Sequence, residues 1–276
     1  MNSIRITCSI VSLCFAGSAL AAQTTDSTSG QKTFFTRRDA VLSGIAIAGS
    51  GAVSIFDERI GQWARSPHVQ GSSARHDAFE NLTVINEVPL TIGAVAIYGI
   101  GRLSGSDVTA KVGLHATEAL ALTVSMSELI RGPLGRARPR ESPNDAYDFS
   151  LGGGFTDFAR RSYPSIHAAA AFATASVLTG ELRERHPDAV PYVAPVLYAA
   201  ALVPGVTRMY LDQHWASDVV AGAFLGTLLG SRVVSYAYSH RPSKLDRALL
   251  AVSVVPDGRG GVIIAKSFAL GNSSAP

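Results

Sequence analysis

The feature that most constrains the fold is a series of long, nearly uncharged stretches, each of helical length. Charged residues make up only 16% of the chain, against about 25% in an ordinary soluble domain. The periodicity of the apolar residues predicts helices at about 40–56, 75–87, 88–102, 107–131, 165–184, 190–203 and 215–238. We therefore expect an all-α protein in which a helical domain spans residues 36–245.

Both ends of this helical domain carry boundary signals. Thr36 and Asp39 have the spacing of a capping box and predict the start of the first helix. After the last helix, two runs rich in β-branched residues, 248–255 and 261–270, flank the sequence Pro-Asp-Gly-Arg-Gly. Strand-forming runs on either side of a turn predict a small C-terminal β-hairpin over residues 246–271.

Residues 1–22 have the features of a secretory signal peptide. A positively charged start precedes an apolar run, and the small residues Ala-Leu-Ala-Ala follow it, as cleavage requires. Both cysteines, Cys8 and Cys14, fall inside this segment, so the mature chain can form no disulfide and no thiolate metal site. The polar stretch 23–35 is then a linker. We expect an exported protein of the periplasm or cell envelope.

The lengths of the apolar stretches bear on whether the chain crosses a membrane. A spanning helix needs about 20 apolar residues, and the stretches after Asp39 and after Asp218 are shorter, while 189–207 contains three prolines. Buried helices of a globular bundle explain these lengths better, so we expect a soluble protein or one associated peripherally with a membrane. The net charge of +3 and the scattered basic residues do not favour nucleic acid as a partner.

Four arginines lie within ten residues in the segment Arg-Gly-Pro-Leu-Gly-Arg-Ala-Arg-Pro-Arg, residues 131–140. Glycine and proline interrupt the run, so the arginines cannot all line one straight helix and would instead surround an anion at a helix end. The guanidinium group stays charged and its fork of donors fits phosphate oxygens. Taken alone, such a run is more typical of a solvated basic loop.

A second segment, Pro164-Ser165-Ile166-His167, precedes an alanine-rich stretch that is a strong helix former. Ser165 and His167 are therefore expected at a helix N-terminus, where free N–H groups attract anions. His167 would be placed there to give a proton to a leaving oxygen. Ser165 could equally be a simple helix cap.

A third segment, residues 207–218, contains His214 and Asp218, which are four residues apart and so share one helix face. A carboxylate at this spacing can accept the proton of one imidazole nitrogen and leave the other free to attack. A single His–Asp pair at this spacing is more often a salt bridge on a helix surface. The functional interpretation depends on all three segments together.

Together they resemble the signature of the superfamily of phosphatidic acid phosphatases, bacterial class A acid phosphatases and vanadium haloperoxidases. That signature reads Lys, six residues, Arg-Pro; then Pro-Ser-Gly-His; then Ser-Arg, five residues, His, three residues, Asp. The residues that match in order and spacing are Arg131, Arg138, Pro139, Pro164, Ser165, His167, Arg208, His214 and Asp218.

The resemblance implies a helical bundle of the acid phosphatase/haloperoxidase type and a metal-independent phosphatase. In that family pattern His214 attacks phosphorus, Asp218 orients it, and His167 protonates the leaving group; water then releases phosphate from the histidine. The phosphate would be held by Arg131, Arg138, Ser165, the N–H of Ile166, and Arg208. No cofactor is implied, and vanadate is expected to act as an inhibitor or phosphate mimic.

Three positions depart from the family pattern. Arg131 stands where the pattern has Lys, and Thr207 where it has Ser, which keeps the charge and the hydroxyl. Ile166 stands where the pattern has Gly. If the backbone there needed a positive φ, a β-branched residue would be strained and the site weakened.

The expected activity is hydrolysis of a phosphate monoester or diphosphate, with a phosphorylated small molecule or lipid as partner. Apolar composition and export favour a lipid slightly. Two alternatives remain at this stage: a vanadium-dependent haloperoxidase using the same oxyanion site, and a non-catalytic envelope protein made inert by Ile166. The long loop 140–161 is the candidate for substrate selection.

Overall fold

The computed structural model describes residues 33–240, 246, 249–250, 252–256 and 262–266. The expected signal peptide, residues 1–22, and most of the expected linker, 23–35, lie outside these residues and stay predictions.

The described chain is mostly helical, which confirms the predicted all-α class. Its helices are α1 (Arg37–Ser54), α2 (Asp57–Arg65), α3 (Pro67–Gln70), α4 (Ser73–Asn81), η2 (Leu82–Val84), α5 (Glu87–Leu103), α6 (Asp107–Leu134), α7 (Gly153–Thr156), η3 (Phe158–Arg160), α8 (Ile166–Arg185), η4 (Pro187–Ala189), α9 (Val190–Tyr210) and α10 (Ala216–Ser239). Thr36 and Asp39 form the expected capping box at the start of α1.

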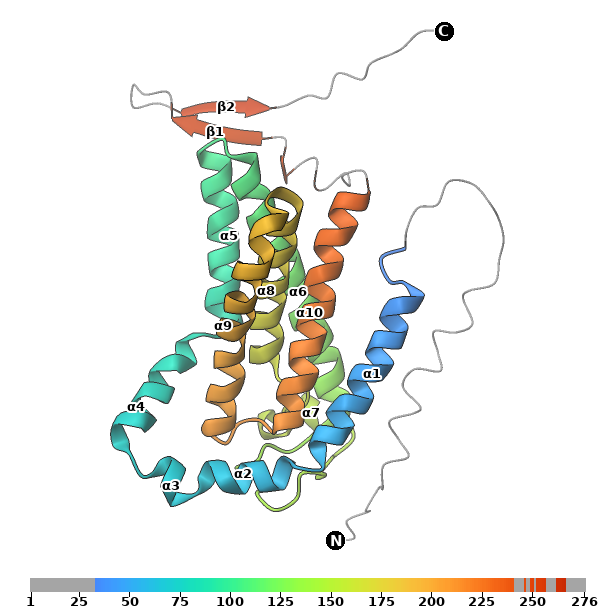
Figure 1. Cartoon of the computed structure of the whole chain (residues 1–276), viewed down its shortest axis with the longest axis vertical. Coiled ribbons are helices and arrows are strands. Elements are labelled where there is room, and N and C mark those ends of the chain that lie inside the picture. Colours follow the sequence, from blue (N-terminus) through green and yellow to red (C-terminus); the bar gives the residue numbers. More distant parts are fainter. Residues whose placement is uncertain (1–32, 241–245, 247–248, 251, 257–261, 267–276) are drawn as a thin grey trace, which may run out of the picture. The chain divides into compact units, whose positions relative to one another are not determined.

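Helix α8 is the centre of the bundle. It packs against α10, α9 and α6, while α5 packs on α6 and α1 on α10. The five helices α5, α6, α8, α9 and α10 run alongside one another, and α2, α3 and α4 cross one end of them on the way from α1 to α5 (Figure 1). That end of the bundle is where α6 and α9 finish and α8 and α10 begin.

Small residues let α8 and α10 approach closely. A Cβ atom added at Gly226 would lie 2.0 Å from the Ala169 carbonyl oxygen, and one at Gly222 would lie 2.3 Å from that of Ser165. Both contacts are far below van der Waals distance, so the two backbones can touch only because these positions are glycine. The facing part of α8 is a run of buried alanines.

Some elements differ from the sequence-based expectation. Helices α2 and α3 were not expected, because each is short and their residues lack a long apolar period. Helix α9 runs to Tyr210 rather than 203, continuing past Pro204, which is buried. Tertiary packing outweighs the local cost of proline at that position.

The C-terminal residues include two strands, β1 (Val252–Pro256) and β2 (Val262–Lys266), paired antiparallel with Val254 opposite Ile264. The turn 257–261 and the last part of the expected hairpin lie outside the described residues. The hairpin over 246–271 as a whole therefore stays a prediction.

The outer helices expose much of their apolar surface. The segment Pro187–Tyr210 and helix α10 are each long and apolar enough to cross a membrane, and two bent helix pairs, α1–α2 and Ser73–Val84 with α5, would raise the number to four. Only 17% of the apolar window in Pro187–Tyr210 is buried, with Tyr192 79% and Val196 66% exposed. The interpretation of this stretch as a buried core helix is therefore wrong.

Candidate active site

His214 lies in the turn between α9 and α10 and is almost completely buried, with 2% of its surface exposed. Its Nδ1–H group donates a hydrogen bond of 2.8 Å to the Ser162 carbonyl oxygen. Its Nε2 atom is buried and has no hydrogen-bond partner among the residues that the structure describes. A fixed Nδ1–H leaves the lone pair on Nε2, so this nitrogen is available to attack.

Burial lowers the pKa of His214, although Asp218 beside it acts in the opposite direction. The imidazole is therefore neutral at physiological pH, as a nucleophile must be.

Asp218 lies in the first turn of α10 but is not the nearest partner of His214. Its Oδ2 atom is 3.7 Å from His214 Nδ1, beyond hydrogen-bond distance, and accepts instead from Ser162 Oγ at 2.6 Å and from the Trp215 N–H at 2.8 Å. The expected direct Asp–His hydrogen bond is thus replaced by one to the Ser162 carbonyl. Asp218 contributes negative charge beside the ring and holds Ser162.

The four arginines of the 131–140 segment take different positions. Helix α6 ends at Leu134 and Gly135 turns the chain with φ 58, a value that favours glycine. Arg131 and Arg138 are buried, whereas Arg140 is exposed and pairs with Glu141 at 3.0 Å. Gly135 thereby separates the arginines, as the sequence suggested.

Arg138 lies in a positively charged environment. Burial first, and then the neighbouring charges of Arg131, Arg140 and Arg208, lower its pKa to about 10. Its guanidinium lies 4.4 Å from the centre of the Phe158 ring and donates to Gln213. Like charges gathered this closely favour a bound anion.

Arg131 and Arg208 complete the positive side of the site. Arg131 donates from Nε and Nη2 to the Arg161 carbonyl, at 3.0 and 2.7 Å, and from Nη1 to Glu128 at 3.0 Å. Arg208, in the last turn of α9, makes a long contact of 3.4 Å to the Thr83 carbonyl.

Ser165 and Ile166 form the N-terminus of α8, as expected. Ser165 is the N-cap, and its hydroxyl accepts from the Ala168 N–H at 3.5 Å. Ile166 is the first helical residue and is buried, and Asp212 is the non-glycine residue with positive φ in the described chain. The Ile166 backbone therefore does not need glycine, and its N–H is one that a helix leaves free.

His167 faces His214, with the two ring centres 5.8 Å apart. Within the described part of the chain its Nδ1 atom is buried without a hydrogen-bond partner, and its Nε2 atom lies 3.7 Å from Glu87 Oε2. Burial first, and then the neighbouring His214 ring and the charges of Arg208, Arg131 and Arg138, lower the pKa of His167 to about 2. His167 is thus neutral in this environment, and a bound anion would favour its protonation.

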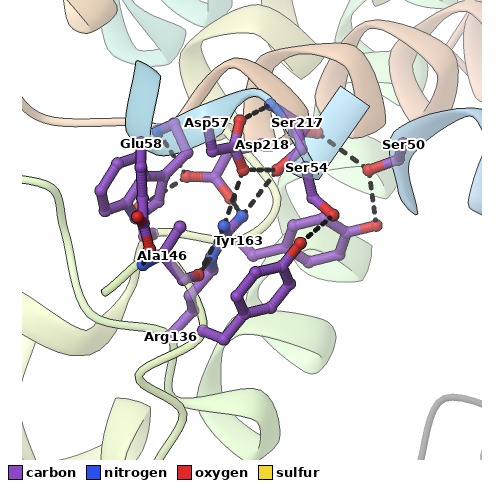
Figure 2. A network of polar contacts seen from close by, with 12 residues as sticks. Ser50, Ser54, Asp57, Glu58, Arg136, Ala146, Tyr163, Ser217 and Asp218 are labelled. Carbon is purple, nitrogen blue, oxygen red and sulfur yellow. Dashed lines mark hydrogen bonds and ion pairs between the residues drawn. The ribbon is translucent and has the colours of Figure 1, made fainter. Parts of the chain in front are cut away.

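Three residues in or beside this site escaped the sequence analysis. Glu87, at the start of α5, approaches His167. Arg136 and Asp57 form a buried ion pair, and Arg136 also pairs with Asp218 (Figure 2). Arg136 was noticed only as one of four arginines, and a single acidic residue at a helix start, such as Asp57 or Glu87, carries no distinctive signal.

No cluster of three or more His, Cys, Asp or Glu side chains within the described ranges is placed to hold a metal ion. The prediction of a metal-independent site does not rest on this observation. Activity measured in the presence of EDTA would test that prediction.

Comparison with known proteins agrees with this geometry. Residues 113–242 match the family model described as the PAP2 superfamily. The chain therefore contains a PAP2 superfamily domain, which confirms the resemblance of the three motifs. Helices α1 to α5 lie before the matched region.

Two curated relatives and one solved structure are similar to this chain. It is 27% identical over 179 residues to a lipid A 1-phosphatase of Porphyromonas gingivalis (65% of this chain, 35% of that protein) and 32% identical over 127 residues to a lipid A 4'-phosphatase of Bacteroides thetaiotaomicron (42% and 51%). The chain thus spans about a third to a half of these relatives.

The solved structure is a crystal structure from Bacillus subtilis titled as the first transmembrane PAP2-type phosphatidylglycerolphosphate phosphatase. It is 20% identical, with a TM-score of 0.51, and the match covers 75% of this chain and 98% of that one. At this identity the likeness concerns the fold alone.

Proposed function

We propose that this chain is a membrane-associated phosphatase that hydrolyses a phosphate monoester on a lipid through a phosphohistidine on His214. The observation that carries the proposal is the Nε2 atom of His214, which is buried and has no hydrogen-bond partner among the described residues. Burial first, and then the nearby arginines, lower the pKa of both site histidines. A neutral nucleophile next to positive charge suits attack on a phosphate group.

The reaction proceeds in two steps. Arg131, Arg138 and Arg208 bind the phosphate oxygens together with the Ser165 hydroxyl and the Ile166 N–H. His214 Nε2 forms a bond to phosphorus, the ester oxygen leaves with the electron pair of the broken bond, and His167 gives it a proton. Water then attacks the phosphohistidine, His167 takes the proton of this water, and inorganic phosphate leaves.

Protonation of His167 depends on the substrate. Burial, and after it the surrounding positive charges, keep its pKa low. A phosphate dianion bound by the arginines reverses this field, so His167 acquires its proton when substrate binds. Glu87, 3.7 Å from Nε2, adds negative charge on the same side.

A lipid substrate is supported by the surface of the bundle. Apolar side chains of α5 and α9 are exposed along the helices, including Ile92 and Val196. Aromatic residues are exposed at the end of the bundle that holds the site, among them Trp63, Phe155 and Phe158. Exposed apolar helices with aromatics near one end fit a bilayer and its interface. The names of the two curated relatives agree with a phosphorylated lipid.

In this arrangement α9 and α10 span the bilayer, α2, α3 and α4 lie at its surface, and the site opens there, where a lipid phosphate lies. Export of the chain, as the expected signal peptide implies, would place it in the cell envelope.

The proposal is tested by phosphate release from purified protein in detergent micelles, with EDTA present and with vanadate as inhibitor. Lipid A, phosphatidic acid and p-nitrophenyl phosphate are compared as substrates, with His214→Ala as the matched variant. We expect turnover of a lipid phosphate that survives EDTA, falls with vanadate and is lost in His214→Ala. Turnover that EDTA abolishes, or that His214→Ala retains, would contradict the mechanism.

A further inference from the structure

A buried carboxylate from outside the matched PAP2 region lies behind the site. Asp57 is the first residue of α2 and is 1% exposed. Its Oδ1 atom accepts from the Ser217 N–H at 2.9 Å, and its Oδ2 atom accepts from the Ser217 hydroxyl at 2.5 Å and from Arg136 Nη2 at 2.8 Å. Asp57 therefore holds both the first turn of α10 and the side chain of Arg136.

Arg136 links Asp57 to Asp218. It donates from Nη1 to Asp218 Oδ1 at 2.5 Å and from Nη2 to Asp57, and its Nε donates to the Ala146 carbonyl at 2.9 Å. Figure 2 shows the guanidinium between the two carboxylates. Asp57 and Asp218 share the single positive charge of Arg136, so the three side chains together carry a net negative charge next to His214.

The corner between α1 and α2 also contacts the loop that follows α6. At the end of α1, Ser50 donates to the Ser217 carbonyl at 3.0 Å, and Ser54 lies 3.0 Å from the Tyr147 hydroxyl. In α2, Glu58 accepts from the Ala146 N–H at 3.2 Å. The α1–α2 corner thus contacts both the first turn of α10, which carries Asp218, and the loop that leads to Ser162.

We propose that Asp57 is a positioning residue for His214 that acts through Arg136 and Asp218, an inference that rests on the proposed function. His214 gains positive charge when it attacks phosphorus, and Asp218 Oδ2, 3.7 Å from its Nδ1, stabilises that charge. Without Asp57, Arg136 pairs with Asp218 alone and neutralises its negative charge. Asp218 then no longer stabilises the positive charge that develops on His214. Substrate binding by the other arginines is unaffected.

The test compares Asp57→Asn with Asp39→Asn in the lipid phosphatase assay. Asp39 is also a buried acid of the α1–α2 region that pairs with α10, through Arg232 at 2.6 Å, but it has no contact with the site residues named above. Both variants keep the shape of the side chain and remove one charge. His214→Ala and unfolding temperatures accompany every measurement.

We expect Asp57→Asn to lower kcat about 10- to 100-fold per folded molecule, the size of a lost charge-assisted hydrogen bond, with KM changed by less than about threefold. Asp57→Glu should restore part of the lost kcat, and Asp39→Asn should keep kcat within about twofold of wild type. A merely structural role would lower stability in both variants without this selective loss of kcat.

Wild-type kcat in folded Asp57→Asn, beside an inactive His214→Ala, would overturn this inference alone. Activity retained in His214→Ala would overturn it together with the proposed function. If Asp57→Asn does not fold, Ser217→Ala tests the same link, because its hydroxyl contacts both Asp57 and Arg136. An unchanged kcat in folded Ser217→Ala would contradict the inference, and a severalfold loss would support it.

Discussion

Arg138 and Arg140 have the same charge and lie two residues apart, but they occupy different environments. Arg138 is buried among other positive charges, whereas the Arg140 side chain is 43% exposed. We expect Arg138→Ala to raise KM for a lipid phosphate about 10- to 100-fold, since a charge-assisted hydrogen bond contributes about 1.5–3 kcal/mol. Arg140→Ala should change KM by less than about twofold, because exposed ion pairs contribute little.

Steady-state kinetics of the two variants decide the point. Equal effects of both substitutions would mean that the basic loop acts through its total charge and not through a phosphate ligand at 138.

The low pKa of His214 predicts how stability depends on pH. In the folded chain burial keeps the imidazole neutral, whereas in the unfolded chain it takes up a proton below about pH 6.5. The unfolded state then binds more protons, so the contribution of His214 to stability is present above about pH 6.5 and is lost as pH falls below it. His167 acts in the same direction.

We therefore expect the unfolding temperature to fall between neutral and mildly acidic pH, and to fall less in His214→Gln, which cannot titrate. Thermal unfolding of both proteins across this pH range measures the difference. Parallel curves would show that His214 is not held neutral by the fold.

Among the helices, the contact between α8 and α10 depends on glycine. A Cβ atom at Gly226 would meet the backbone of α8, while one at Gly99 in α5 would meet no atom of the described residues within 4 Å. We expect Gly226→Ala to lower the free energy of unfolding by about 1–3 kcal/mol, as overpacking of a core does. Gly99→Ala should leave it unchanged or raise it slightly, because alanine favours a helix.

Thermal or denaturant unfolding of the two alanine variants tests this prediction. A stable Gly226→Ala protein would show that the two helices can separate without cost.

The sequence allowed the bundle helices to be predicted because each has a clear apolar period and, at Thr36 or Ser165, a local cap. It did not allow α2 to be predicted, because that helix is short and polar and its position depends on Asp57 contacting Ser217, 160 residues away. The spacing of the motifs identified His214, His167 and the arginines 131 and 138. It could not show that the Ser162 carbonyl, and not Asp218, is the nearest partner of His214 Nδ1, since that depends on how a long loop folds back.

At the scale of the whole molecule, the sequence did not predict correctly whether α9 is buried or exposed. The prolines in α9 and its limited length pointed to a core helix, yet the helix faces outward. We expect the protein to stay in the membrane fraction after alkaline carbonate and high-salt washes and to need detergent for release. Recovery in the wash supernatant would contradict a spanning arrangement and favour a soluble or peripheral bundle.

The central claim is covalent: His214 carries the phosphate during turnover. The most direct test is to quench the purified protein in alkali during turnover of a lipid phosphate and to analyse its peptides by mass spectrometry. The account predicts phosphate on the peptide that contains His214, absent in His214→Ala and reduced by vanadate. Continued turnover with no phosphate on His214, or with phosphate on a different residue, would contradict it.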